Sequence, residues 1–253
     1  MDDIKNAILT ALPGSLGKQL YFLKNGSRVM HTELMKDLFI DLEIRKHDNL
    51  WADRLSQREG HEPGICEWFA KYLTPKDSFF DIGSCYGIFS ALVAKLQPSI
   101  PIHAWEPAFA NFLFLEQNAK RNKGNVAWKL SRKFVSDTND SENTTLDEYC
   151  KNNNIYPTVI KMDIDGGEYH ALKNAEELIK RRKTHFLIEI HPQFLGDRNI
   201  KVDQVLELFP KDFTIKVLPE IRDKNLGWTD DLSLIYSDFN PYIYVAAEEI
   251  YLL

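Results

Sequence analysis

The sequence predicts an α/β fold with a mostly parallel sheet and helices on both of its faces. Strand-like and helix-like segments alternate from about residue 78 onward, as in parallel sheets with helical crossovers. Most of the predicted strands are mainly apolar, as expected of strands that helices cover on both sides. With 253 residues, the chain can form one large domain with a substantial core, or at most two small ones.

Seven segments are predicted to be strands. In chain order they cover residues 78–82, 101–105, 126–130, 158–162, 186–190, 213–218 and 242–246. Apolar stripes at helical spacing predict helices between them, around residues 88–96, 171–179 and 202–209, and Pro210 is expected to end the last of these.

Residues 1–75 are expected to form a small cap, distinct from an α/β domain over residues 76–253. Asn25-Gly26 predicts a hairpin turn between two strands at residues 19–23 and 28–31. Helices are expected near residues 33–45 and 64–72.

Two polar connections, residues 131–145 and 220–240, are longer than a compact fold needs. They are interpreted either as lids or as long loops without a function.

Composition argues against several classes of protein. The 31 Lys and Arg residues are outnumbered by 37 Asp and Glu residues, so the net charge of −6 disfavours a nucleic-acid partner. Cys66, Cys85 and Cys150 predict neither a disulfide framework nor a zinc site, because their number is odd and their spacing fits no ligand pattern. No signal peptide and no apolar run long enough for a membrane span is apparent. We therefore expect a cytoplasmic protein, and its oligomeric state stays open.

The run FFDIGSCYGIFS, residues 79–90, reads as a strand, a glycine turn and the start of a helix. It contains Gly83 and Gly87 but lacks the third glycine of the dinucleotide fingerprint. Asp81 at the strand tip would repel a pyrophosphate, whereas it would attract an ammonium or a sulfonium group. Glu106 ends the next predicted strand, where an acid can accept hydrogen bonds from ribose hydroxyls. Together these residues predict S-adenosylmethionine rather than a nicotinamide cofactor, although glycines also serve tight turns.

A second acidic group surrounds VIKMDIDGGEYHAL, residues 159–172. Asp163 ends the fourth predicted strand, and Glu168 is expected on the sheet-facing side of the next helix. Glu189 and His191 are two residues apart in the fifth strand, so they share one face. We interpret the four as a polar cluster in which one group takes the proton of an acceptor hydroxyl. The alternative is that Glu168 is a helix N-terminal acid and His191 a hydrogen-bonded edge residue.

A divalent ion bound by these carboxylates and His191 is a further alternative, because hard oxygen ligands suit magnesium. It ranks below metal-free catalysis, so no residue is assigned as a metal ligand.

Five short runs resemble the FkbM-type methyltransferases: DIGSCYG, the EP of AWEP, TTLDEY, IKMDIDGGE and IEIHP, within about residues 60–250. The resemblance implies a class I methyltransferase (Rossmann-like) fold with seven strands, and methyl transfer from S-adenosylmethionine to an oxygen of a sugar or a polyketide-like product. The predicted cofactor-binding residues are Asp81, Gly83, Ser84, Gly87 and Glu106. The chain departs from the family at Ser84-Cys85-Tyr86 and at Asp165, where Ala-Asn-Ile and Glu are more usual.

The sequence therefore predicts an S-adenosylmethionine-dependent methyltransferase that acts on a hydroxyl of a glycan or small-molecule acceptor. An RNA methyltransferase is an alternative, disfavoured because DIDG stands where amino-group enzymes carry an Asn/Asp-Pro-Pro-aromatic motif. A non-catalytic cofactor-binding protein is another, which would have no need of the second acidic cluster. Trp228 and His61 are possible acceptor-pocket residues.

Overall fold

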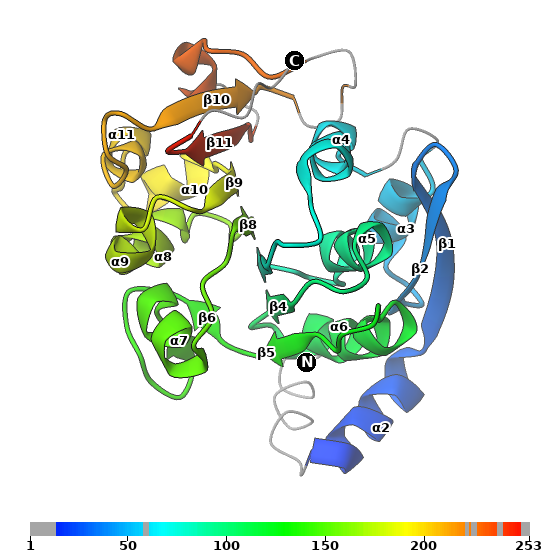
Figure 1. The fold of residues 1–253 in the computed structure, drawn as a ribbon. Helices are drawn as coiled ribbons and strands as arrows, with labels where there is room; N and C mark the ends of the chain where they lie inside the picture. Colours follow the sequence, from blue (N-terminus) through cyan, green and yellow to red (C-terminus); the bar gives the residue numbers. More distant parts are fainter. Residues whose placement is uncertain (1–13, 58–60, 221–222, 224–226, 237–239, 249–253) are drawn as a thin grey trace.

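The computed structural model describes residues 14–57, 61–220, 223, 227–236 and 240–248. Its centre is a seven-stranded sheet with the order β10-β11-β9-β8-β3-β4-β5 (Figure 1). The strands are β3 (Phe79–Ile82), β4 (Ile102–Trp105), β5 (Lys129–Ser131), β8 (Val159–Met162), β9 (His185–Glu189), β10 (Thr214–Leu218) and β11 (Tyr242–Ala246). Among these strands, β11 pairs antiparallel with both β9 and β10, whereas the other neighbouring pairs are parallel. The predicted fold is confirmed, and each strand overlaps a predicted segment.

Helices cover both faces of the sheet (Figure 1). One face bears α4 (Pro63–Tyr72), α5 (Ile88–Leu96) and α6 (Phe109–Arg121); the other bears α7 (Leu146–Asn153), α8 (Glu168–Lys173), α9 (Glu176–Lys180), α10 (Pro192–Asp197) and α11 (Val202–Leu206). Successive strand residues divide between two buried clusters, since Phe79 and Val159 belong to the first, and Phe80 and Ile160 to the second. This alternation is the period of two that a strand imposes.

Two predicted helices differ from the observed ones. The apolar stripe of residues 171–179 is divided between α8 and α9, because the backbone leaves the helical conformation at Asn174 and Ala175. The stripe of residues 202–209 continues past the end of α11 at Leu206. Apolar side chains can therefore keep helical spacing across a short irregular segment.

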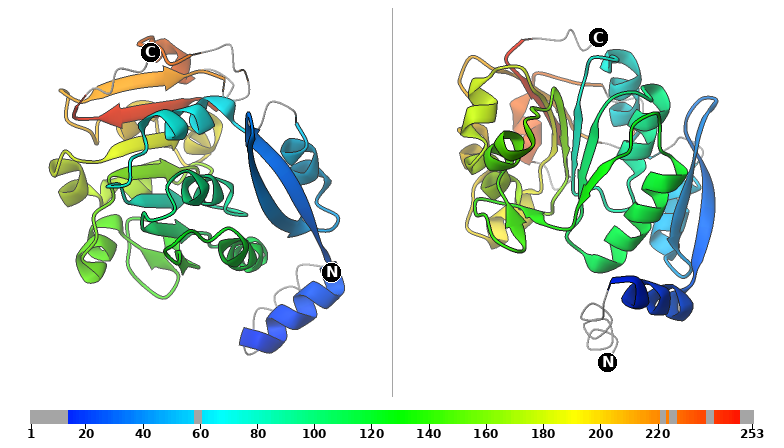
Figure 2. Two further views of the ribbon diagram at one scale, coloured as in Figure 1. Left: turned by 45° about the vertical axis from the view of Figure 1, so that its right-hand side comes forward. Right: turned by 60° about the horizontal axis from the view of Figure 1, so that its bottom comes forward.

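The N-terminal elements extend one helical layer outward. They are α2 (Gly14–Asn25), β1 (Ser27–Met35), β2 (Leu38–Arg45) and α3 (Asn49–Leu55). The β1–β2 hairpin packs on α5 and α6 rather than on the sheet (Figure 2). Asn118 of α6 joins the layers: its Oδ1 accepts from Glu43 N at 2.6 Å, and its Nδ2 donates to Tyr86 O at 2.9 Å.

The predicted hairpin around Asn25-Gly26 is wrong. Asn25 is the last residue of α2, and Gly26, with φ +65°, donates its N–H to Phe22 O at 2.8 Å. Asn-Gly therefore caps a helix here, because a residue with positive φ ends a helix as readily as it turns a hairpin.

The helix predicted over residues 33–45 is also wrong, since β2 occupies most of this range. Ile40, Leu42 and Ile44 are buried in alternation, so the local pattern was that of a strand.

The polar connection of residues 131–145 is partly ordered by a parallel pair, β6 (Phe134–Val135) with β7 (Asn143–Thr144). The connection of residues 220–240 lies partly outside the described residues and contains the short helix η1 (Leu232–Tyr236). Within the described part of the chain, no helix has both the length and the apolar content needed to cross a membrane.

Candidate active site

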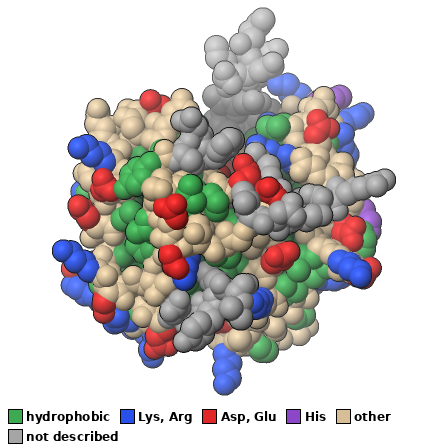
Figure 3. All heavy atoms as spheres, turned by 90° about the horizontal axis from the view of Figure 1, so that it is seen from above, with side chains coloured by type: hydrophobic (Ala, Val, Ile, Leu, Met, Phe, Trp, Pro, Cys, Tyr) green, Lys and Arg blue, Asp and Glu red, His purple; other side chains and the backbone are tan. Residues whose placement is uncertain are grey.

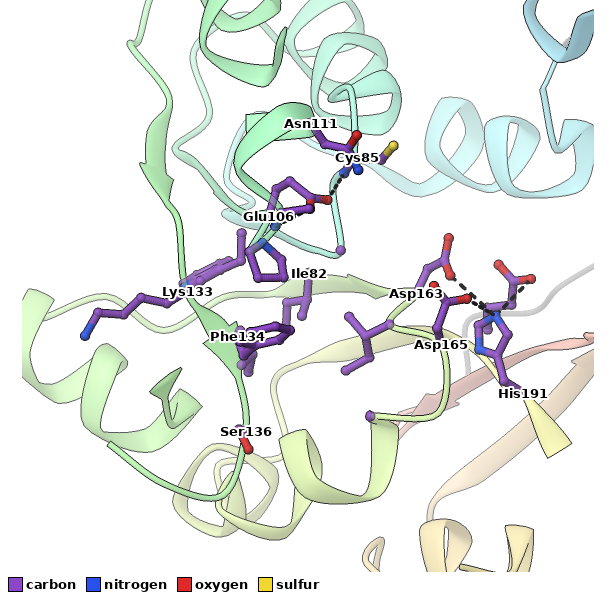
Figure 4. A pocket seen from close by; sticks show the side chains of 18 of the residues that line it. Ile82, Cys85, Glu106, Asn111, Lys133, Phe134, Ser136, Asp163, Asp165 and His191 are labelled. Carbon is purple, nitrogen blue, oxygen red and sulfur yellow. Dashed lines mark hydrogen bonds and ion pairs between the residues drawn. The ribbon is translucent and has the colours of Figure 1, made fainter. Parts of the chain in front are cut away.

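A cavity of about 740 Å³ opens at the carboxyl ends of the parallel strands, where open α/β sheets bind their ligands. Figure 4 shows two groups of side chains on its wall. The Glu106 end is formed by Gly83, Cys85, Glu106 and Asn111; the Asp163 end is formed by Asp163, Asp165, Glu189 and His191. Lys133 to Ser136, which follow β5, also line the cavity.

At the Glu106 end, a buried carboxylate is held by backbone donors of two loops. Glu106 Oε2 accepts from Cys85 N at 3.0 Å, and its Oε1 accepts from Ala108 N at 2.8 Å. Burial raises the pKa of Glu106 to about 7, although these two N–H groups oppose the rise. Gly83 has φ +80°, and a Cβ there would lie 1.8 Å from the carbonyl oxygen of Asp163. Only glycine permits this close approach of the loops after β3 and β8.

Three of the predicted cofactor residues lie outside the cavity wall. Asp81 is 1% exposed, and its Oδ2 accepts from Ser90 N at 3.2 Å and from Ser90 Oγ at 2.6 Å. Ser84 Oγ donates to Trp105 O at 3.1 Å, and Gly87 is the left-handed N-cap of α5. These residues stabilise the conformation of the glycine loop without lining the cavity.

The Asp163 end is organised around His191, which is 2% exposed. Its Nδ1 lies 2.8 Å from Glu168 Oε1. Its Nε2 lies 3.6 Å from each of three carboxylate oxygens, Asp163 Oδ1, Asp165 Oδ1 and Glu189 Oε1. Figure 4 shows Asp163 and Asp165 converging on the ring.

The structure brings all four residues of the predicted polar cluster together. Asp163 follows β8, Glu189 ends β9, and His191 precedes α10. Glu168, the first residue of α8, is fully buried behind the ring and also accepts from Gly166 N at 3.0 Å. Glu168 therefore contacts His191 rather than lining the cavity.

The charges at the Asp163 end depend on one another. Burial lowers the pKa of His191, but the hydrogen bond and charge of Glu168, with Glu189 and Asp163, outweigh it and raise that pKa to about 9. Burial, helped by Asp163, raises the pKa of Glu189 to about 8. Lys161 is 3% exposed and pairs with Asp163 at 3.1 Å. In the absence of other ligands, His191 and Lys161 are thus both cations at neutral pH.

Sequence reasoning missed two buried charges beside this cluster. Lys161 was detectable, because a lysine within the apolar strand β8 needs a partner. Glu62 was not, because an acid at a helix N-terminus is common. Its Oε1 lies 3.0 Å from His61 Nε2, whereas its Oε2 is buried without a hydrogen-bond partner among the described residues. His61 therefore supports a wall residue, while Trp228 packs against Tyr244 outside the wall.

One segment of the chain is similar to a known protein family. Residues 96–216 match the model of the methyltransferase FkbM domain. The matched segment is just under half of the chain. The match confirms the resemblance seen in the sequence. The matched segment includes Glu106 and the four residues of the polar cluster, whereas the glycine loop precedes it.

Two individual proteins similar to this chain carry the FkbM name. The chain is 32% identical over 115 residues to the 31-O-demethyl-FK506 methyltransferase FkbM of Streptomyces tacrolimicus, an alignment that covers 46% of this chain and 37% of that protein. It is similar in structure to methyltransferase FkbM from Methylobacillus flagellatus KT, with a TM-score of 0.51 and 19% identity over 70% of this chain and 46% of that one. The chain thus spans less than half the length of both relatives.

A third likeness is to the O-methyltransferase from Bacillus cereus in complex with SAH, with a TM-score of 0.50 and 12% identity over 79% of this chain and 87% of that one. At such identities the solved structures establish the fold alone, which is that of the class I methyltransferases.

Proposed function

We propose that this chain is an S-adenosylmethionine-dependent methyltransferase that methylates a hydroxyl oxygen of a glycan or small-molecule acceptor. The observation that carries the proposal is the shared cavity. A carboxylate suited to a ribose lies at one end, and a cluster suited to accepting a proton lies at the other. The name of the Streptomyces relative, which specifies an O-demethyl substrate, supports an oxygen acceptor.

The charges on the cavity wall support a cationic cofactor. S-adenosylmethionine carries two positive groups, an ammonium and a sulfonium. On the cavity wall, the buried Oε2 of Glu62 has no hydrogen-bond partner within the described residues, so it offers an acceptor to a cationic ligand. Glu106 would accept hydrogen bonds from the ribose, next to the backbone of Gly83 and Cys85. Asp81 and Ser84 would act by fixing the loop, together with Gly87. The bound cofactor would supply an electrophilic methyl group.

The chemistry required of the protein is modest. The acceptor oxygen forms a bond to the methyl carbon while the carbon–sulfur bond breaks, and the sulfur leaves as a neutral thioether. The proton of the hydroxyl passes to the acidic cluster, where Asp163 faces the cavity and the cationic His191 orients it. Glu168 fixes the imidazole ring, and Glu189 completes the cluster. Positioning supplies most of the rate, and a base adds roughly 10²–10⁴-fold.

The acceptor would be recognised in part by the N-terminal residues, which we propose act as a cap on the methyltransferase domain. Trp51 and Arg54 of α3 lie on the cavity wall, with the Arg54 guanidinium 5.3 Å from the Trp51 ring centroid. An aromatic face beside several hydrogen-bond donors suits a hydroxyl-rich acceptor.

An RNA acceptor has less support. On the described atoms of the face in Figure 3, Lys and Arg side chains are scattered among acidic and neutral ones and form no continuous basic surface. The net charge of −6 agrees with this distribution.

Two measurements test the proposal. Calorimetry should detect binding of S-adenosylmethionine and of its demethylated product, but no binding of NAD. Tight binding of NAD alone would overturn the proposal. A transfer screen with labelled cofactor across glycans, lipids, small hydroxylated metabolites and RNA should label a hydroxyl compound. Cofactor binding without transfer to any acceptor class would favour a non-catalytic binding protein.

A further inference from the structure

The Nε2 atom of His191 faces three carboxylates without forming a hydrogen bond to any of them. All three distances are 3.6 Å, beyond hydrogen-bond length. The hydrogen bond of this ring is made on its other side, by Nδ1 to Glu168 at 2.8 Å. A carboxylate can only accept, so the proton of the neutral ring lies on Nδ1 and the lone pair of Nε2 points at oxygens.

In the neutral ring this lone pair faces carboxyl oxygens, an arrangement that is unfavourable unless a cation lies between them. A proton on Nε2 would draw one oxygen to about 2.8 Å, whereas the oxygens of Asp163, Asp165 and Glu189 are equally distant. A metal ion about 2.1 Å from each ligand holds the ligand atoms roughly 3–3.5 Å apart, close to the 3.6 Å that separates Nε2 from each oxygen. Ligand atoms of Asp163, Glu189 and His191 all lie within 4.8 Å of one another.

Glu189 provides an independent observation. The residue is 7% exposed, it lines the cavity, and its nearest ionic partner among the described residues is the distant Nε2 of His191. A buried carboxylate is costly without a partner. Lys161 compensates only in part, since its ammonium pairs with Asp163.

We infer that Asp163, Glu189 and His191 bind a divalent cation of the magnesium or manganese type at the Asp163 end of the cavity. Glu168 acts as the positioning residue, because a carboxylate on the far nitrogen of a ligating histidine fixes the tautomer and the orientation of the ring. Two carboxylate oxygens and one imidazole leave coordination positions open toward the cavity. Asp165 can approach one of them, since it is 80% exposed in its side chain and lies on the same side of the ring.

The ion would deepen the proposed function, and this part of the inference rests on it. An acceptor hydroxyl bound to the cation loses its proton more readily and is held in one orientation. The proton then passes to a carboxylate of the cluster, and the oxygen attacks the methyl group. This differs from the metal-free mechanism that the sequence alone favoured.

The test is a metal titration without cofactor or acceptor. Chelator-treated protein is titrated with Mn²⁺, free Mn²⁺ is followed by electron paramagnetic resonance, and Mg²⁺ is added as competitor. We expect one ion per chain, displaced by Mg²⁺. Glu168→Gln should weaken binding about 10–100-fold, and Glu189→Gln and Asp163→Asn at least as much. Glu106→Gln is the matched control, a buried carboxylate of the same cavity outside the cluster, and it should bind Mn²⁺ normally while losing cofactor affinity.

Absence of Mn²⁺ binding at millimolar concentration would overturn the inference, as would unchanged affinity in Glu189→Gln shown by thermal unfolding to be folded. Binding restricted to Zn²⁺ would overturn the assignment of a hard cation. Because no methyl transfer is measured, failure here leaves the proposed methyltransferase standing. Conversely, if Mn²⁺ binds specifically but the separate transfer screen labels no acceptor, the metal site stands and the proposed methyltransferase does not.

Discussion

The two ends of the cavity are built in different ways. At the Glu106 end, one carboxylate is held by backbone N–H groups of the loops after β3 and β4, and Gly83 allows the loop after β3 to come close to the loop after β8. At the Asp163 end, side chains from β8, α8 and the end of β9 converge on one imidazole. The Glu106 end is thus formed mainly by backbone groups, and the Asp163 end by a network of charged side chains.

The difference teaches which perturbations each end should tolerate. The Glu106 end is formed by backbone groups and depends on the local conformation of a few residues, so it should be sensitive to an added Cβ. A charge network depends on every member, because a buried charge without its partner is costly. Changes at the Asp163 end should therefore affect turnover, and changes at the Glu106 end should affect cofactor affinity.

The largest effect is expected for Asp163→Asn, which keeps the shape and removes the charge. Turnover should fall by roughly 10²–10⁴, while cofactor affinity changes by less than about threefold, because only transition-state stabilisation is lost. Steady-state kinetics and calorimetry measure the two quantities. Asp212→Asn is a control, because this carboxylate pairs with Arg182 on the surface at 2.8 Å. A large loss of cofactor affinity in Asp163→Asn would mean that cofactor binding and turnover do not depend on separate ends of the cavity.

His191→Asn should reduce turnover to a similar degree, and the double variant with Asp163→Asn should cost little more than either change alone. This non-additivity is expected of residues that act as a unit. Fully additive losses of kcat would show that the pair does not cooperate.

Glu106→Gln should weaken cofactor binding about ten- to a hundred-fold, because hydrogen bonds to a charged acceptor contribute roughly 1.5–3 kcal/mol. Calorimetry with S-adenosylmethionine checks this, and circular dichroism should show an unchanged fold. An unchanged dissociation constant would assign the ribose to another residue.

Gly83→Ala should destabilise the protein by at least about 1–3 kcal/mol, because the new Cβ meets the Asp163 carbonyl in a left-handed conformation. Gly196→Ala is the matched control, since no atom lies within 4 Å of the position of its Cβ, and helical alanine should be neutral or slightly stabilising. Denaturant unfolding compares them. Equal stability of the two variants would show that the loops at Gly83 and Asp163 can move apart without cost.

The smallest effect is one of pH. The pKa of Glu106 is raised to about 7 by burial, so the carboxylate becomes protonated as pH falls below this value. Cofactor affinity should then be constant above pH 7 and fall by up to about tenfold per pH unit below it. Calorimetry across pH 5.5–8.5 tests this, and the slope attributed to this carboxylate should vanish in Glu106→Gln. A slope that persists there would assign the titration to another group.

Local sequence patterns were sufficient for the sheet and for the glycine loop. The apolar runs of β3 and β8 predict buried strands because a doubly covered strand must be apolar along its whole length. The same holds for Gly83, since a tight strand-to-helix turn is a property of consecutive residues. The N-terminal hairpin failed for the converse reason, because Asn25-Gly26 is compatible with two local structures and packing decided between them.

The sequence by itself determined the α/β architecture, the FkbM resemblance and three acids of the cavity wall, Glu106, Asp163 and Glu189. Only the tertiary structure decided how the acids meet. Pairing of Met162 with Ile188 places Asp163 beside Glu189, and a shift of one residue in that register would point these side chains to opposite faces. The contact between Glu168 and His191 joins residues 23 positions apart in the chain. Such contacts depend on strand register and helix placement, which no local pattern contains.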